Sequence, residues 1–216
     1  MPGKVPEFQP ERFRAVAIGS STGAPTLVQQ IITGLPADLS VPVLIAQHLP
    51  PSFTQDMAVA MDNRSPMTVV EAEDGQPVFP GTVYLGRGRM HMRIVLGPTK
   101  RPTIQVSDQP KDLLYKPSVD ELFSSCAKIY RDKTLGIVMT GIGRDGVLGA
   151  KMIVDAGGVL LTQSKATCAV YGMPRACDEA KLPTASLSPE ELRQAIHQLS
   201  PTYQATEQNS RPSRSA

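Results

Sequence analysis

The stretch that decides the fold is Ala15-Val-Ala-Ile-Gly-Ser-Ser-Thr-Gly-Ala24. Its apolar start predicts a buried strand over about 15–19, and the pattern that follows predicts a helix over about 24–34. A strand that turns sharply into a helix places the turn at the carboxyl edge of a sheet, where open α/β folds hold their ligands. The N–H groups at the start of the helix also favour negative charge there.

The turn itself fits the pattern G-x-S-x-G, with Ser21 in the middle of Gly19-Ser-Ser-Thr-Gly23. A serine at such a turn can act as a nucleophile whose oxyanion is met by main-chain donors. The alternative is structural, because Ser21 or Thr22 could simply cap the helix. A nucleophilic serine needs a base, so the rest of the chain has to supply one.

The composition is that of an ordinary soluble globular protein, with 216 residues, 41% apolar and 19% charged. This length predicts one sizeable domain with a substantial core. A net charge of +2 and the lack of a basic run argue against nucleic acid as a partner. No apolar run reaches the roughly 18 residues of a membrane helix, so no membrane insertion is expected. The first residues lack the apolar region of a signal peptide.

Cysteine and histidine usage indicates a cytoplasmic protein without a metal or other cofactor. The three cysteines are widely spaced and odd in number, which fits a reducing compartment and no disulfide framework. There are only three histidines, with no C-x-x-C and no H-E-x-x-H motif, so we expect no zinc site. The sequence leaves the oligomeric state open.

Strand and helix patterns alternate along the chain. Further strands are expected at 41–47, 67–72, 83–85, 91–96, 103–106, 135–140 and 159–163. Further helices are expected at 52–62, at 118–130, after Gly146 to about 156, from Pro174 onward and at 189–199. The helix at 118–130 opens with a capping box, Ser118-Val-Asp-Glu121.

This order predicts an α/β fold. We expect a doubly wound, mainly parallel sheet with helices on both faces, and a small antiparallel β insertion in the middle of the chain. Residues 1–14 are expected to form an irregular lead-in and 15–200 a single domain. Residues 201–216 are polar and proline-bearing, and we expect them to be disordered.

Three polar residues lie just past the ends of predicted buried strands: Ser21, His48 and Asp145. Such strand ends gather on one edge of a parallel sheet, so the three side chains could converge. His48 would then take a proton from Ser21, and Asp145 would orient the imidazole and stabilise its charged form.

Each of these residues also has a structural interpretation. His48 could be a turn residue in Gln47-His-Leu-Pro50, and Asp145 could cap the helix that follows it. The other two histidines are less suited to act as the base. His91 is expected to be half-exposed on a strand, and His197 to lie on the surface of the last helix.

The glycine pattern Gly141-x-Gly143-x-x-Gly146 resembles a dinucleotide-binding fingerprint. That motif expects an acid about 20 residues further on, where this chain has Gln163-Ser-Lys165. A carboxylate at Asp145 would also repel a pyrophosphate. The α/β-hydrolase fold does not fit either, because its triad runs serine, acid, histidine.

Six stretches, in order over about residues 15–180, resemble the catalytic domain of the chemotaxis protein-glutamate methylesterases, the CheB family. They are Ile18-Gly-Ser-Ser-Thr-Gly23, Gln47-His-Leu-Pro-Pro-Ser-Phe-Thr54, Glu71-Ala-Glu-Asp-Gly75, Lys116-Pro-Ser-Val-Asp120, Thr140-Gly-Ile-Gly-Arg-Asp-Gly146 and Tyr171-Gly-Met-Pro-Arg175.

The resemblance implies hydrolysis of glutamyl methyl esters on chemoreceptor helices, with deamidation of certain receptor glutamines at the same site. It implies a triad of Ser21, His48 and Asp145. We expect the main-chain N–H groups of Thr22 and Ile142 to be the oxyanion donors. The competing hypothesis is a non-enzymatic α/β module that binds a phosphate-bearing ligand or a signalling partner through the same glycine turns.

The chain departs from the family pattern at several points. Ala24 stands where typical members have a second glycine, Ile142 where many have methionine, and Arg144 where many have asparagine. Typical members begin with a receiver domain, whereas 14 residues precede the first predicted strand here. We therefore expect a free-standing member or a catalytic fragment, with no control by receiver phosphorylation encoded in this chain.

Basic residues near the same sheet edge could steer a glutamate-rich receptor helix toward the site. The expected members of this basic rim are Arg87, Arg89, Arg93, Lys116, Arg144 and Arg175.

Overall fold

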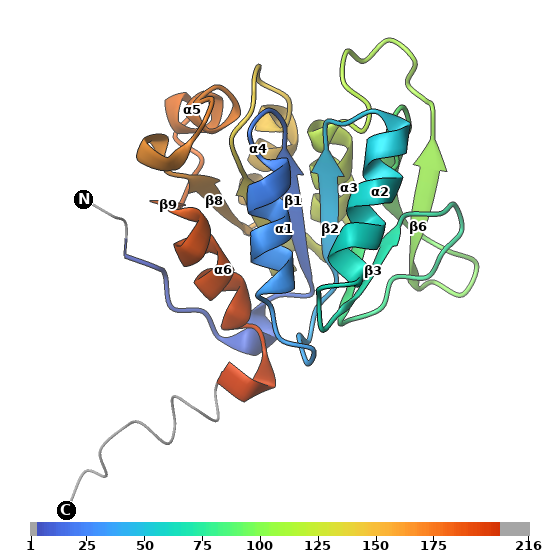
Figure 1. Ribbon diagram of the computed structural model, residues 1–216, viewed down its shortest axis with the longest axis horizontal. Coiled ribbons are helices and arrows are strands. Elements are labelled where there is room, and N and C mark those ends of the chain that lie inside the picture. Colours follow the sequence, from blue (N-terminus) through green and yellow to red (C-terminus); the bar gives the residue numbers. More distant parts are fainter. Residues whose placement is uncertain (1–3, 204–216) are drawn as a thin grey trace, which may run out of the picture.

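The fold is built on one parallel sheet, seen in a computed structural model that describes residues 4–203 (Figure 1). Its strands lie in the order β3-β4-β2-β1-β7-β8-β9, and every neighbouring pair is parallel. The strands are β1 (Ala15–Ser20), β2 (Val43–Gln47), β3 (Thr68–Glu71), β4 (Thr82–Leu85), β7 (Thr134–Val138), β8 (Val159–Gln163) and β9 (Ala185–Leu187).

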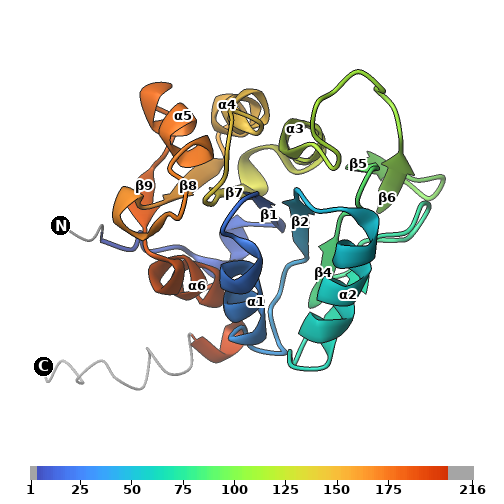
Figure 2. The same cartoon turned by 45° about the horizontal axis from the view of Figure 1, so that its top comes forward.

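Helices cover both faces of this sheet, as expected (Figure 2). One face carries α1 (Pro25–Thr33), α2 (Pro51–Asp62) and α6 (Pro189–His197). The other carries α3 (Val119–Tyr130), α4 (Val147–Asp155) and α5 (Met173–Glu179).

Alternation along β1 separates the two halves of the core, because successive side chains of a strand point to opposite faces. Val16 and Ile18 pack in the cluster under α1, whereas Ala15 and Ala17 pack in the cluster under α3. Small residues on the α3 side let that helix lie close to the strand. At Gly19 an added Cβ would lie 2.1 Å from Cγ1 of Val119, so only glycine admits the start of α3 here.

The expected antiparallel insertion is present as a ribbon of β5 (His91–Leu96) and β6 (Pro102–Ser107). The two preceding strands, β3 and β4, instead extend the main sheet in parallel. Residues 72–81 carry the chain back along the sheet, so β3 and β4 point the same way and cannot form a hairpin.

A few short elements were not expected from the sequence. They are β9 and the 3₁₀ turns η1 (Pro10–Arg12), η2 (Arg131–Lys133) and η3 (Lys165–Thr167). Such short runs give too little periodicity to be recognised.

The expectation of disorder from residue 201 onward is wrong for its first residues. Residues 201–203 are helical, and the N–H of Thr202 donates to Asp38 Oδ2 at 3.1 Å. The remainder, 204–216, lies outside the described residues. Within residues 4–203, no helix is both long and apolar enough to span a bilayer.

The strand order sets the place of the site. From β1 the chain moves to β2 on one side, and it later returns to place β7 on the other side of β1. This change of direction makes the carboxyl ends of β1 and β7 a topological switch point, the place where open α/β sheets bind ligands.

Candidate active site

The ends of β1 and β2 are tied together by polar contacts. Ser20 and Gln47 are the last paired residues, and the Ser20 hydroxyl donates to Gln47 Oε1 at 2.6 Å. Gln47 Nε2 donates to the carbonyl oxygen of Ser21 at 3.0 Å, and the N–H of His48 donates to that of Ser20, also at 3.0 Å. Because successive side chains of a strand alternate between faces, the residues that follow, Ser21 and His48, direct their side chains to the face covered by α3.

Ser21 sits in the turn after β1 with its main chain held on both sides. Its N–H donates to the carbonyl of Thr140 at 3.0 Å, and its own carbonyl accepts from the N–H of Ala24 at 3.1 Å. The residue is 7% exposed, and within residues 4–203 its hydroxyl makes no hydrogen bond. The capping interpretation is wrong, because Ala24 is the N-cap of α1 and no side chain caps that helix end.

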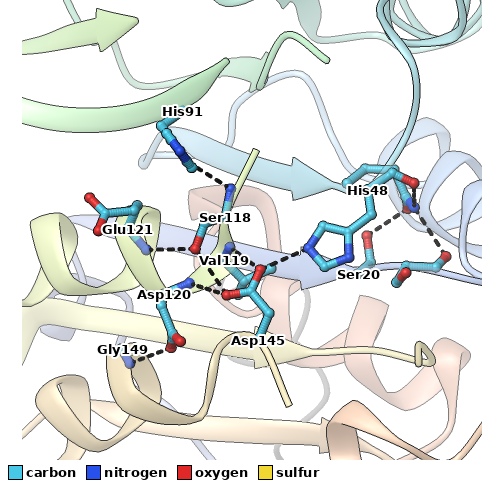
Figure 3. Close-up of polar contacts among 11 residues, drawn as sticks. Ser20, His48, His91, Ser118, Val119, Asp120, Glu121, Asp145 and Gly149 are labelled. Atoms are coloured by element: carbon cyan, nitrogen blue, oxygen red, sulfur yellow. Dashed lines mark hydrogen bonds and ion pairs between the residues drawn. The ribbon is translucent and has the colours of Figure 1, made fainter. Parts of the chain in front are cut away.

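Asp145 connects His48 to the start of α3 through hydrogen bonds (Figure 3). Its Oδ2 lies 2.8 Å from His48 Nε2 and accepts from the N–H of Val119 at 2.7 Å. Its Oδ1 accepts from the Ser118 hydroxyl at 2.9 Å and from the N–H of Asp120 at 3.1 Å. The carboxylate is thus held by four donors, three of them from the first turn of α3.

Asp145 therefore does cap a helix, but not the helix that follows it in sequence. The helix after it, α4, has Gly146 as its N-cap and no side-chain cap bond. The carboxylate instead satisfies the free N–H groups at the start of α3, where the helix dipole also favours negative charge. The structural and the functional interpretations of this aspartate are both compatible with the geometry.

The environment keeps Asp145 ionised. Burial of the carboxylate acts to raise its pKa, but hydrogen bonds from His48 and from the N–H groups of Val119 and Asp120 outweigh it, and the pKa lies below its ordinary value. A neighbouring carboxylate behaves differently. Burial, with the charge of Asp145 nearby, raises the pKa of Asp120 to about 6 although it accepts from the N–H of Gly149 at 2.7 Å.

His48 is held in one orientation with one nitrogen unused. Its side chain is 9% exposed and its ring stacks on Tyr115, with centroids 4.3 Å apart and planes 2° from parallel. Because an ionised carboxylate only accepts, the proton of the neutral ring is assigned to Nε2. The other nitrogen, Nδ1, is buried and has no hydrogen-bond partner within residues 4–203. Its lone pair can accept a proton.

The glycine loop after β7 approaches Ser21 closely. At Gly141 an added Cβ would lie 2.6 Å from Cβ of Ser21 and 2.3 Å from Sδ of Met173, so no larger residue fits. The next residue, Ile142, is 54% exposed. In the described part of the chain, neither the N–H of Ile142 nor that of Thr22 donates a hydrogen bond. Thr22 follows Ser21 in sequence, and Ile142 follows Gly141, which lies against Ser21, so these two N–H groups are the candidates for binding an oxyanion.

The other histidines lie elsewhere. His91 is fully buried, so the expectation of a half-exposed strand residue is wrong. Its Nε2 bonds to the carbonyl of Pro110 at 3.1 Å, and its Nδ1 accepts from the N–H of Ser118 at 3.2 Å. His197 is half-buried on α6, where its ring meets that of Tyr203 edge-on.

The expected basic rim is smaller than the sequence indicated. Arg93 is half-buried and forms an ion pair with Glu121, and Lys116 is half-buried with its Nζ on the carbonyl of Asp108 at 3.0 Å. These two residues hold the structure together and do not belong to an open rim. The four that remain exposed are Arg87, Arg89, Arg144 and Arg175.

Among residues 4–203, no group of three or more histidine, cysteine, aspartate or glutamate side chains is arranged to hold a metal ion. The polar groups around Ser21 instead form one connected network of main-chain and side-chain hydrogen bonds. That network can orient a histidine and offer donors to an oxyanion.

A family model described as CheB methylesterase matches residues 16–196. The chain belongs to this family. It is 42% identical over 181 residues to a protein-glutamate methylesterase/protein-glutamine glutaminase of Oleidesulfovibrio alaskensis, covering 84% of this chain and 49% of that protein. It is 40% identical over 180 residues to one of Caulobacter vibrioides, covering 83% and 52%. This CheB family member thus spans about half the length of the curated relatives it matches.

A solved structure of the family has the same architecture. The crystal structure of the Thermotoga maritima CheB methylesterase catalytic domain is 34% identical to this chain, with a TM-score of 0.82. The match covers 87% of this chain and 98% of that one. The doubly wound fold and the family resemblance expected from the sequence are confirmed.

Three residues that contact the proposed triad were not predicted as site residues: Gln47, Tyr115 and Ser118, the last expected only as part of a capping box. Gln47 links Ser21 to His48, Tyr115 stacks on His48, and Ser118 donates to Asp145. Gln47 and Ser118 lie inside the stretches that resemble the CheB family, which was the available signal. Tyr115 lies directly before one of them.

Proposed function

We propose that this chain is a cytoplasmic, cofactor-free enzyme that hydrolyses glutamyl methyl esters on chemoreceptors and deamidates receptor glutamines. Ser21 is the nucleophile, His48 the base and Asp145 the acid that orients it. The observation that carries the proposal is the pairing of His48 Nε2 with Asp145 at 2.8 Å, which leaves a buried Nδ1 with no partner among residues 4–203, beside the turn of Ser21. The names of the curated relatives support the same reaction.

The first half of the reaction forms a glutamyl-enzyme. The Ser21 hydroxyl attacks the carbonyl carbon of the ester, and its proton passes to Nδ1 of His48. The N–H groups of Thr22 and Ile142 bind the oxyanion that develops on the carbonyl oxygen. Asp145 stabilises the imidazolium. As the intermediate collapses, the imidazolium returns its proton to the leaving oxygen and methanol departs; from a glutamine, ammonia departs.

The second half restores the enzyme. A water molecule gives one proton to His48 and attacks the carbonyl carbon of the glutamyl-enzyme. The second tetrahedral intermediate collapses to a free glutamic acid side chain, which loses its proton to solvent, and the proton on His48 returns to the oxygen of Ser21. Each turnover on an ester consumes one water and releases one methanol and one proton. Each turnover on a glutamine consumes one water and releases ammonia, and in both cases the protein is unchanged.

The direct test is methanol release from methylated receptor membranes incubated with the protein. We expect release that scales with protein concentration and stops when the methyl esters are exhausted. The competing hypothesis, a non-enzymatic module, predicts binding to such membranes or to a phosphate-bearing ligand without any methanol. If no methanol were released from fully methylated receptors, the hypothesis that this chain is a methylesterase would be wrong.

Removal of metal ions should leave activity unchanged. The proposed chemistry uses only the serine, the histidine, the aspartate and main-chain donors, so no step requires a metal ion. Exhaustive treatment with EDTA, followed by the methanol assay, should give the rate of the untreated protein. A loss restored by added zinc would contradict the triad account.

The exposed arginines should make the rate on receptors depend on salt. If they attract an acidic receptor helix, kcat/KM should fall by roughly threefold to tenfold between low and high ionic strength as the charges are screened. The double variant Arg87→Gln, Arg175→Gln should flatten this slope. An uncharged small ester serves as the control and should show little salt dependence. If kcat/KM depended on ionic strength equally for the receptor and for the small ester, the steering hypothesis would be wrong.

A further inference from the structure

We propose that the β5–β6 ribbon positions Asp145 through the first turn of α3, and that His91 is the positioning residue at this contact. The inference rests on the proposed function, because it assigns Asp145 to the triad. Within residues 4–203, His91 makes no hydrogen bond with Asp145 or His48. It acts on them through Ser118, the N-cap of α3.

Strand β5 holds the start of α3 through three polar interactions. His91 Nδ1 accepts from the N–H of Ser118 at 3.2 Å, and Arg93 forms an ion pair with Glu121. The N–H of Ile94 donates to the hydroxyl of Ser125 at 2.9 Å. All three fall within the first two turns of the helix, so the helix start cannot shift along the ribbon without breaking them.

The ring of His91 suits this task because both of its nitrogens are used. It is fully buried, with Nε2 bonded to the carbonyl of Pro110 and Nδ1 to the N–H of Ser118. Only the neutral ring with its proton on Nε2 satisfies both contacts. Burial, the largest effect, lowers its pKa; the Pro110 contact and Glu121 act in the opposite direction, and Arg93 and Lys116 add to the lowering. The ring therefore stays neutral and keeps its acceptor.

Further hydrogen bonds connect the contact between His91 and Ser118 to the triad (Figure 3). Ser118, whose N–H donates to His91, also donates its hydroxyl to Asp145 at 2.9 Å. The next two N–H groups, of Val119 and Asp120, donate to the same carboxylate. A shift of Ser118 would move all three donors at once, and Asp145 with them, relative to His48.

A comparison within the chain indicates that the contact does more than stabilise a helix end. At α6, Ser188 and Glu191 form a complete capping box, in which Glu191 accepts from the N–H of Ser188 at 2.7 Å. The same motif at α3 forms only in one direction. Ser118 accepts from the N–H of Glu121 at 3.4 Å, but the carboxylate of Glu121 turns to Arg93. The local partner of the Ser118 N–H is thus replaced by His91, which ties the cap to the ribbon.

The experiment compares His91→Gln with His91→Asn. The asparagine amide oxygen reaches roughly the place of Nδ1 and can still accept from Ser118. The longer glutamine amide reaches roughly the place of Nε2 and keeps only the contact with Pro110. We expect His91→Gln to lower kcat about 10- to 100-fold with KM changed less than about twofold. His91→Asn should stay within about threefold of the native kcat.

A second measurement needs no substrate. The proton on His48 Nε2, bonded to Asp145, should give a low-field NMR signal that is absent in His48→Gln. We expect this signal to weaken through faster solvent exchange in His91→Gln and to persist in His91→Asn. A purely structural role for His91 would lower the melting temperature of both variants and leave the signal intact in the folded protein.

The outcomes separate the two proposals. If both variants fold and keep the native kcat and the native signal, the positioning role is overturned even though the enzyme is active. If the native protein releases no methanol but the signal responds as described, the proposed function fails and the positioning role stands. Should His91→Gln not fold, Arg93→Gln removes another ribbon contact. It should lower kcat and weaken the same signal, and no change in either would overturn the proposal.

Discussion

Replacing Ser21 with alanine should lower kcat for methanol release by at least about 10³-fold while the protein stays folded. In the proposed mechanism the oxygen of this hydroxyl attacks the ester, and within residues 4–203 the hydroxyl makes no hydrogen bond whose loss would disturb the turn. The N–H and carbonyl of Ser21, which do hold the turn, are retained by alanine. The measurement is single-turnover methanol release, with circular dichroism and thermal unfolding to verify the fold.

Ser20→Ala is the matched control, one residue away. The Ser20 hydroxyl is fully buried and donates to Gln47 Oε1 at 2.6 Å. Its removal should cost about 1–3 kcal/mol of stability, because a buried acceptor loses its donor, but turnover should fall far less than in Ser21→Ala. If Ser20→Ala abolished turnover and Ser21→Ala retained it, the nucleophile would be misassigned.

Replacing His48 with glutamine should also lower kcat/KM by about 10³-fold or more. In the proposed mechanism Nδ1 of His48 takes the serine proton and the imidazolium returns it to the leaving group, and the glutamine amide can do neither. The measurement is methanol release from methylated receptors, with circular dichroism to verify that the variant is folded.

The control is His197→Gln. His197 lies on α6, on the opposite face of the sheet from α3, and packs against Tyr203. This variant should keep the native rate. A folded His48→Gln protein that kept the native rate would show that another group acts as the base.

The sequence predicted the parts of the site that depend on local pattern. Strand ends are visible as apolar runs that stop at glycine or proline, so Ser21, His48 and Asp145 could each be placed at the carboxyl edge. The structure does bring His48 and Asp145 together there. The parallel sheet followed from the alternation of strands and helices.

The parts that could not be predicted depend on residues far apart in sequence. The alternative interpretation of Asp145 was a cap on the next helix, but three of its four donors come from the start of a helix that begins 26 residues earlier, at Val119. The alternation of apolar and polar residues along β5 predicted a half-exposed His91. It could not show that Ser118 and Pro110, which lie further along the chain, would contact and bury the ring. Arg93 was assigned to an open rim because its partner, Glu121, lies 28 residues further on.

The position of β7 beside β1 also determines when the site can exist during folding. Ala15 pairs with Thr134, and His48 lies 97 residues before its partner Asp145. Contacts between such distant segments require a long loop to close and form slowly compared with local structure. During synthesis, Ser21 and His48 leave the ribosome well before Asp145 is made. A chain in which β7 has not paired with β1 therefore has no oriented base, and esterase activity would report the formation of this pairing.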